Sequence, residues 1–158
     1  MINDKNTPDA VAWILYINPD IAIALGQFEI IYILKYEKNK LKNINGPVFC
    51  NQSVLWKDKL IKVFDLDCFI NIHNKDIKKI LYEYIVIIPY IEDEKKDILF
   101  LGLKVINIPV KRQVKDTQQC DYPDNYDWDK LSSSCFYDEK YGIIPVLDLT
   151  KISVSIGK

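Results

Sequence analysis

The sequence is poor in the residues from which most reaction centres are built. Among its 158 residues it has one histidine, one arginine and five glycines, and the glycines occur singly. Single glycines exclude the glycine-rich loops that hold dinucleotides or nucleotide phosphates. The serine run at 132–134 has no G-x-S-x-G motif around it, so a nucleophile elbow has no support. We therefore expect no catalytic residues and no bound cofactor.

Metal ligands and membrane spans are also scarce. The four cysteines have no C-x-x-C spacing, and the single histidine, His73, has only Cys68 near it. Two ligands do not make a zinc site, so we expect no bound metal. No apolar run approaches the length of a membrane span, and the polar, slightly acidic first ten residues do not resemble a secretory signal. We therefore expect a cytoplasmic protein with reduced thiols.

The composition is that of an ordinary globular domain. Apolar residues make up 49% of the chain and charged residues 27%, which is enough apolar material to bury a core. The net charge of −1 provides no global field that would draw the chain to nucleic acid or acidic lipid. The length fits one domain, or two small domains packed closely together.

The strongest pattern is an apolar segment that occurs twice. Residues 60–70 read LIKVFDLDCFI and residues 143–152 read IIPVLDLTKI, so Asp65 aligns with Asp148, 83 residues later. In each copy an apolar run meets Asp-Leu, where an aspartate ends a strand and caps the helix behind it. The wide spacing indicates a duplicated subdomain, since solenoid repeats recur every ~20–50 residues. We interpret both aspartates as structural caps, in preference to a pair of catalytic carboxylates.

Short apolar runs separated by turn residues predict strands along most of the chain. An opening hairpin is predicted at 11–17 and 21–25, around Asn18-Pro19-Asp20. The segment 26–34 fits a short helix by its spacing and a strand by its β-branched residues. A helix is predicted at 76–84, and further strands are predicted at 48–56, 84–91, 98–105 and 131–137. This order favours an all-β barrel class.

Two polar segments are interpreted as solvated loops. The lysine-rich stretch at 35–42 is typical of a solvated loop, in preference to a binding patch. The segment 121–129 (DYPDNYDWD) carries four aspartates and three aromatic residues. We expect its aromatic side chains to pack inward and its aspartates to face solvent, in preference to a site for a basic partner.

The repeated V-x-D-L at the end of two β segments resembles the CheW-like domain family. Residues 54–66 are similar to the family's I-N-L-R-G-x-x-x-P-V-x-D-L segment, and 143–149 to its second-barrel counterpart. Residues 13–25 resemble its opening hairpin, and 85–105 its second-half hairpin. The resemblance implies an all-β fold of two intertwined, five-stranded SH3-like barrels with short helical segments. It implies one domain at 10–152, with approximate subdomains at 10–75 and 84–152 and an exchange of strands left open.

The resemblance also implies a function. CheW-like proteins are non-catalytic scaffolds that couple chemoreceptors to the histidine kinase CheA, and relatives serve type IV pilus chemosensory systems. The resemblance therefore implies an adaptor between a CheA-type kinase and a chemoreceptor or pilus-linked sensor, without nucleic acid or membrane insertion. It places the partner-facing positions in the first subdomain, at Glu29, Ile30, Leu55, Trp56, Lys57 and Asp58.

The sequence departs from the family at those positions. Leu55, Lys57 and Asp58 stand where the family has Asn, Arg and Gly, and residues 102–105 lack the Asp of its Val-Asp-x-Val. Lysine cannot make the bidentate fork that arginine makes with a carboxylate. We therefore expect a retained scaffold with a divergent contact surface. For Trp56, at the end of a strand, an exposed hot spot and a core position are both open.

Two other function classes stay open. An SH3-like or OB-like barrel can bind nucleic acid or a small ligand, through a basic groove with stacking aromatic residues in the case of nucleic acid. The slight net negative charge and the single arginine disfavour that alternative. A small enzyme with an unrecognised site is the third class, and the missing catalytic groups disfavour it.

Overall fold

The structure, a computed structural model, describes residues 10–71, 79–91 and 97–156. Strands dominate this part of the chain. They are β1 (Ala10–Asn18), β2 (Ile21–Gly26), β3 (Tyr32–Lys35), β4 (Lys42–Asn43), β5 (Gln52–Trp56), β6 (Lys59–Phe64), β7 (Tyr84–Ile91), β8 (Ile98–Val105), β9 (Val110–Val114), β10 (Ser132–Asp138) and β11 (Gly142–Leu147). The helices are α1 (Leu66–Ile70), α2 (Leu149–Ile156) and the short 3-10 turns η2 (Lys38–Lys40), η3 (Val48–Cys50), η4 (Asp116–Gln118) and η5 (Trp128–Lys130).

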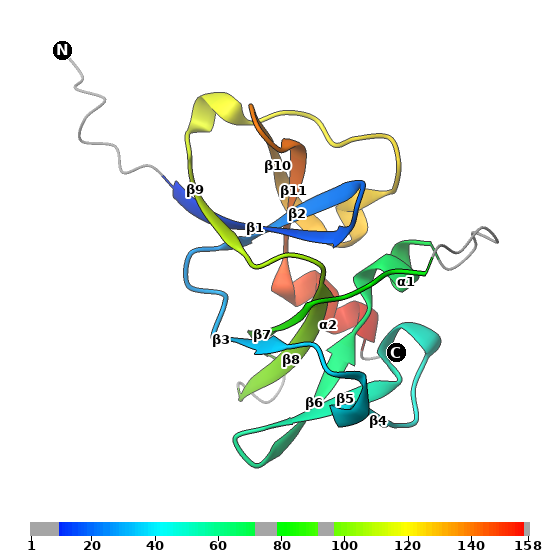
Figure 1. Cartoon of the computed structure of the whole chain (residues 1–158). Coiled ribbons are helices and arrows are strands. Elements are labelled where there is room, and N and C mark those ends of the chain that lie inside the picture. The colour runs from blue at the N-terminus through cyan, green and yellow to red at the C-terminus, as the bar shows by residue number, and fades with distance from the viewer. Residues whose placement is uncertain (1–9, 72–78, 92–96, 157–158) are drawn as a thin grey trace.

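The strands form two sheets, which confirms the all-β class with short helical segments. The five-stranded sheet has the order β10-β11-β2-β1-β9, and the six-stranded sheet has the order β3-β7-β8-β6-β5-β4. In Figure 1 the five-stranded sheet lies above, the six-stranded sheet lies below, and α2 lies between them. The additional strand of the larger sheet is β4, which is only two residues long. Without β4, both sheets have the five strands that the resemblance implied.

The two sheets exchange hairpins. The β1–β2 hairpin joins β9, β10 and β11, whereas the β7–β8 hairpin joins β3, β5 and β6. In both sheets one of the two contacts to the exchanged hairpin is parallel, between Val63 and Gly102 in one and between Val146 and Ala24 in the other. Val63 and Val146 are positions that the sequence repeat aligns, so the repeat extends to strand register. The boundaries of the domain and of its subdomains stay predictions, and each sheet draws strands from both proposed ranges.

The apolar side chains gather in three clusters. One fills the five-stranded sheet and includes Ile14 and Ile144, and another fills the six-stranded sheet and includes Val54. The largest cluster lies between the sheets and includes Leu15 and, from α2, Ile152. Ile14 and Leu15 are neighbours in β1 but belong to different clusters, because successive side chains of a strand point to opposite faces. Each sheet is therefore curved around one cluster and packed on the shared one.

Asp65 and Asp148 lie at equivalent corners of the fold, as the repeat predicted. Asp65 follows β6 and accepts the Cys68 N–H at 3.0 Å at the start of α1. Asp148 follows β11 and accepts the Thr150 N–H at 3.0 Å and the Lys151 N–H at 3.4 Å at the start of α2. Both backbones are also tied to the turn before the preceding hairpin, Asp65 to Phe49 and Asp148 to Leu131. The interpretation of both aspartates as helix caps is confirmed.

Several predicted elements have different bounds in the structure. The helix predicted at 76–84 is wrong for the residues that the structure describes, because 79–83 have no regular structure and Tyr84 begins β7. The spacing of its apolar residues suited a helix, but at the end of the segment Glu83 and Tyr84 are extended and bond to the chain at β3 and β8. Residues 48–50 form η3 rather than the first part of a strand. The strand β9 at the edge of its sheet was not predicted, although its VKRQV sequence alternates.

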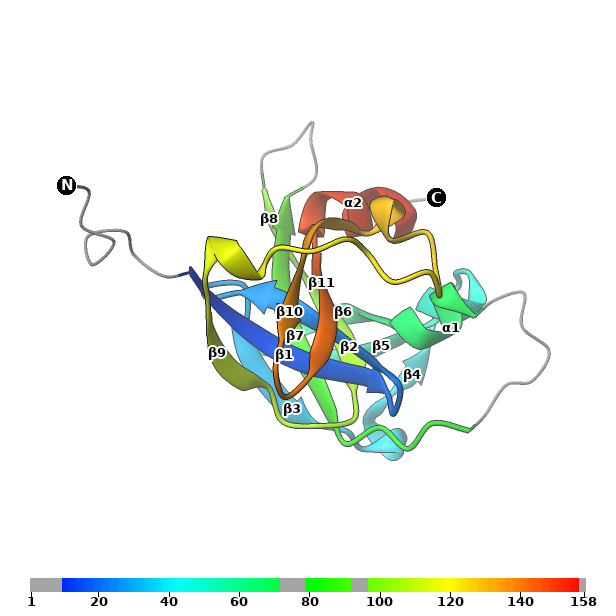
Figure 2. The same ribbon diagram turned by 90° about the horizontal axis from the view of Figure 1, so that it is seen from above.

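The interpretation of the segment 121–129 is confirmed. Trp128 is buried in the cluster between the sheets, and Tyr122 and Tyr126 pack against it. All four aspartates of the segment are exposed. The segment belongs to the long connection between β9 and β10, drawn in yellow and gold, which runs around the outside of the five-stranded sheet in Figures 1 and 2.

Candidate functional site

The β5–β6 hairpin presents the most compact group of the predicted partner-facing residues. Its strands pair from Gln52 with Val63 up to Trp56 with Lys59, so only Lys57 and Asp58 form the loop. Both loop residues have positive φ, 49° for Lys57 and 62° for Asp58. Positive φ at both central positions is the signature of a type I′ turn, whose twist matches that of the strands. The turn therefore holds two oppositely charged side chains at a well-defined tip.

Two leucines lie opposite each other on the outer face of this hairpin. Leu55 of β5 pairs with Leu60 of β6, and their side chains are 61% and 63% exposed. Cross-strand neighbours on one face are in side-chain contact distance. Leu55 also lines a hollow of about 230 Å³ together with Leu34, Val54 and Ile85. The rim of this hollow is charged and consists of Lys35, Glu37 and Lys40. The surface is thus an apolar spot with a polar rim.

Trp56 points away from this surface. Its side chain is 8% exposed and belongs to the cluster inside the six-stranded sheet. Its ring meets Phe100 edge-on, with centroids 5.3 Å apart, and lies 6.1 Å from the ring of Tyr32. The Lys57 ammonium covers the ring at 4.9 Å. Of the two alternatives for Trp56, the structure shows the core position, because the side-chain alternation of β5 directs Val54 and Trp56 inward and Leu55 outward.

Glu29 and Ile30 lie on the connection between β2 and β3, and both make internal contacts. The Glu29 carboxylate accepts the Gly26 N–H, and the Glu29 N–H donates to the Gly26 carbonyl at 3.0 Å. Ile30 packs against the cluster between the sheets. The connection approaches the hairpin through Tyr32, whose ring contacts Trp56. The structure therefore brings Leu55, Lys57 and Asp58 together on one hairpin, whereas Glu29 and Ile30 belong to a separate, internally bonded turn between β2 and β3.

Leu60 was not among the predicted partner-facing residues. The signal in the sequence was available, because β6 alternates between buried Ile61 and Val63 and exposed Leu60 and Lys62. Given a two-residue turn at 57–58, the residue opposite Leu55 is Leu60. The register of the hairpin, rather than the family pattern, therefore identifies it.

A buried lysine lies beside the first of the two helix corners. Lys104 Nζ donates to Gln52 Oε1 at 2.7 Å and lies 3.7 Å from Asp65 Oδ2. Asp65 Oδ1 also accepts the Tyr82 hydroxyl at 2.8 Å. Burial, followed by the charge of Asp65, raises the pKa of Tyr82 well above its usual value, so that its hydroxyl remains a donor. These groups satisfy one another, and the cluster stabilises the corner.

The described residues contain no group of three His, Cys, Asp or Glu side chains placed to hold a metal ion. His73 lies outside the described residues. Within the same ranges, no helix has the length and apolar content needed to cross a membrane.

Two sheets exchange the hairpins β1–β2 and β7–β8, and an aspartate-capped helix follows each of the other hairpins, β5–β6 and β10–β11. This arrangement defines a duplicated double-barrel fold. No family model and no curated protein matches the sequence. Among solved structures, the fold matches the crystal structure of the scaffolding protein TtCheW from Thermoanaerobacter tengcongensis with a TM-score of 0.70. The match covers 94% of this chain and 90% of that chain at 16% sequence identity. The chain therefore has a CheW-like fold, which confirms the resemblance seen in the V-x-D-L repeat.

Proposed function

We propose that this protein is a non-catalytic cytoplasmic adaptor that couples a CheA-type histidine kinase to a chemoreceptor or a pilus-linked sensor. The observation that supports this most is the CheW-like fold over 94% of the chain, shared with a protein described as a scaffold. The described residues present an exposed apolar spot and no cluster suited to a metal ion. An adaptor needs only surfaces that hold two partners at once.

The kinase-facing surface in this proposal is the outer face of the β5–β6 hairpin. Leu55 and Leu60 supply an apolar anchor, and Lys57 and Asp58 supply opposite charges at the tip. Interface energy concentrates in a few well-packed apolar anchors surrounded by polar residues. The resemblance implies two further partner contacts, Glu29 and Ile30, which lie on the turn between β2 and β3. Trp56 does not contact the partner in this proposal. Its buried ring stabilises the strand that carries Leu55.

The test is a pull-down and titration against the CheA-type kinase of the same organism. We expect the double variant Leu55→Ser/Leu60→Ser to weaken binding by about 30-fold or more, which corresponds to about 2 kcal/mol of a hot spot. Lys57→Glu should weaken binding less, because a charge at the rim contributes little. The matched control is Ile143→Ser, since Ile143 is the residue that the repeat aligns with Leu60 and lies on the other sheet.

Trp56→Ala requires a separate reading. Removing a buried aromatic side chain costs about 3–5 kcal/mol of folding free energy, so the kinase binding of this variant has to be measured in the native fraction.

If the leucine variant and Ile143→Ser both bind like wild type, the kinase contact lies elsewhere on the fold. Equal losses in the two variants would point to a general effect on folding.

The alternative is a barrel that binds nucleic acid. Sequence-independent binding of single strands uses exposed aromatic rings as stacking platforms. In the six-stranded sheet Trp56 is buried, Phe100 packs against the same interior cluster, and Tyr32 is 51% exposed, so one of these three rings is open to a base. This arrangement favours the adaptor. Salt-dependent binding of an oligonucleotide at micromolar concentration would instead support the alternative.

A further inference from the structure

Two thiols lie side by side in the five-stranded sheet. The sulfur atoms of Cys120 and Cys135 are 3.8 Å apart, and all four cysteines are free thiols. Cys135 belongs to β10, and Cys120 follows η4 in the long connection from β9. Gln119 forms an antiparallel bridge with Phe136, and the Cys120 N–H donates to the Cys135 carbonyl at 3.0 Å. In an antiparallel pairing, the residue after Gln119 lies opposite the residue before Phe136, so Cys120 and Cys135 are directly opposite each other.

This placement suits a disulfide without movement of the backbone. Directly opposite residues of antiparallel strands have Cα atoms roughly 4.5–5.5 Å apart. Disulfides join residues whose Cα atoms lie about 4.4–6.8 Å apart. The two sulfur atoms already face each other, so rotation of the side chains is the remaining change. Sequence patterns do not reveal this pair, because the two cysteines are 15 residues apart and in no recognised motif.

The two thiols differ in access. Cys120 is half-buried and lines an open hollow of about 490 Å³ that Arg112, Gln118 and Asp138 also line. Cys135 is buried. Burial, followed by the hydrogen bond between the two thiols, raises the pKa of Cys135 to about 12, so Cys135 stays protonated at neutral pH. Oxidants of the size of a peroxide therefore reach Cys120 first, with Cys135 placed as its neighbour.

We propose that Cys120 and Cys135 are a redox modification site, at which a peroxide converts the two thiols into a reversible intramolecular disulfide. The Cys120 thiol gives up its proton and its sulfur attacks one oxygen of hydrogen peroxide. The O–O bond breaks, Cys120 becomes a sulfenic acid, and the leaving hydroxide takes up the proton as the first water. The Cys135 sulfur then forms the S–S bond to Cys120 while the S–O bond breaks, and the leaving hydroxide takes the Cys135 proton as water. In total, two thiols and one hydrogen peroxide give one disulfide and two waters.

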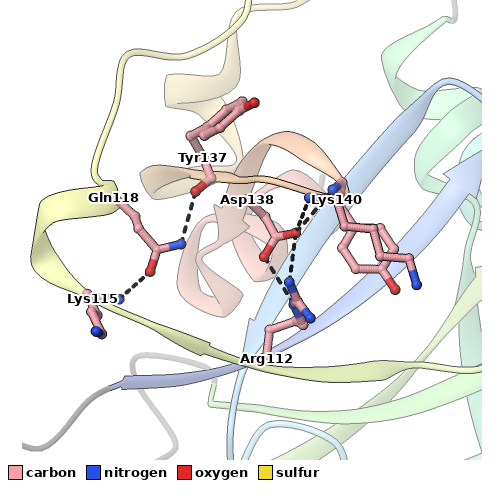
Figure 3. Close-up of polar contacts among 7 residues, drawn as sticks. Arg112, Lys115, Gln118, Tyr137, Asp138 and Lys140 are labelled. Carbon is pink, nitrogen blue, oxygen red and sulfur yellow. Dashed lines mark hydrogen bonds and ion pairs between the residues drawn. The ribbon is translucent and has the colours of Figure 1, made fainter.

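The disulfide would join two segments that are now held by hydrogen bonds. Gln118 Nε2 donates to the Tyr137 carbonyl at 3.0 Å, and Gln118 Oε1 accepts the Lys115 N–H at 2.7 Å (Figure 3). Close by, the guanidinium of Arg112 on β9 binds the Asp138 carboxylate on β10. These contacts close the side of the sheet between its edge strands β9 and β10. Oxidation would add a covalent bond between the β9–β10 connection and β10, on the same side of the sheet.

Peptide mapping tests the bond directly. Trypsin cleaves after Lys115, Lys130 and Lys140, which places the two cysteines on separate peptides, 116–130 and 131–140. After treatment of the folded full-length protein with hydrogen peroxide and blocking of free thiols, we expect these two peptides to be linked and a dithiol reductant to separate them. Unlinked peptides with an overoxidised Cys120, or a bond between two protein molecules, would overturn the proposal. A bond that is already present and resists reduction in the folded protein would also overturn it.

Thermal unfolding gives an independent readout. A disulfide that closes a loop of about 15 residues should raise the melting temperature by roughly 5–10 °C relative to the reduced protein. Cys120→Ala should remove both the link and the shift, and, because Cys120 is half-exposed, this variant should fold even if Cys135→Ala does not. The matched control is Cys68→Ala, which removes another half-exposed thiol and should keep both effects. A shift that persists in Cys120→Ala would exclude this pair as its cause.

Discussion

The two helix-capping aspartates occupy the same place in the two halves of the fold but have different surroundings. Asp148 accepts only backbone N–H groups from the first turn of α2 among its described hydrogen bonds. Asp65 accepts the Cys68 N–H, and in addition the Tyr82 hydroxyl, with the Lys104 ammonium nearby. The duplication therefore preserved the backbone corner, whereas the buried polar cluster exists at one corner only.

Removing the aspartates one at a time should separate these two contributions. We expect Asp65→Ala to lower the free energy of unfolding by about 3 kcal/mol, because it removes a cap and leaves Lys104 and Tyr82 without their buried partner. Asp148→Ala should cost about 1 kcal/mol, the usual loss for a helix cap, and leave kinase affinity in the native fraction unchanged. Urea unfolding of both variants measures the difference.

Equal losses in the two variants would mean that the Lys104 cluster contributes nothing to stability. Asp65→Asn sharpens the result, since it keeps an acceptor for Tyr82 and removes only the charge that faces Lys104. Weaker kinase binding by Asp148→Ala with unchanged stability would place Asp148 in an interface.

The open sides of the two sheets are closed by different chemistry. Between β9 and β10, Arg112 Nε and one terminal nitrogen bind the two oxygens of Asp138 at 3.1 and 3.3 Å. Between β3 and β5, the corresponding contact is the ring pair of Tyr32 and Trp56. A bidentate ion pair depends on geometry and protonation, whereas a ring contact does not titrate. The two closures should therefore respond differently to acid.

Acid titration of stability tests that difference. Burial alone would raise the pKa of Asp138, but hydrogen bonds from Arg112 and from the Lys140 and Tyr141 N–H groups outweigh it and hold the pKa below its usual value. The stabilisation is therefore complete above the pKa of the unfolded chain and is lost as the pH falls through the lower folded value. Asp138→Asn should flatten this acid dependence, as measured by unfolding at several pH values.

Arg112→Lys should lower stability at neutral pH by about 1.5 kcal/mol, because lysine cannot form the two parallel hydrogen bonds. Tyr32→Ala is the control on the other sheet, and its effect should not change between neutral and acidic pH. If Arg112→Lys is neutral, the pair is a surface contact rather than the closure of the sheet.

The turns of the two repeat hairpins give the smallest effects. The β5–β6 turn places Lys57 and Asp58 at positive φ, whereas the β10–β11 turn has Gly142 at a φ of 81°. Residues other than glycine are strained in this region. We expect Lys57→Asn/Asp58→Gly to raise stability by about 0.5–1 kcal/mol, and Gly142→Ala to lower it by about 1 kcal/mol. Denaturant midpoints at unchanged slope would measure both, and a gain from Gly142→Ala would contradict the argument.

The sequence predicted a strand or a helix cap correctly where residues of one short segment determine it. The strands at 84–91 and 98–105 have the predicted bounds, and both V-x-D-L copies end in a capped helix. The helical spacing at 76–84 was misleading, because the described residues 79–83 have no regular structure and Tyr84 begins a strand. For the candidate site, the two strands follow from the apolar runs predicted at 48–56 and 60–70, while the burial of Trp56 and the role of Leu60 depended on register.

The sequence by itself determined where most of the strands lie, where the two caps lie and that the halves are related, since these follow from residue type and periodicity along a few residues. The tertiary structure decided which hairpin joins which sheet, that Trp56 faces the core, and that Cys120 meets Cys135. These outcomes join residues far apart in the chain. They depend on which combination of faces buries the most apolar surface, and no local pattern encodes that choice.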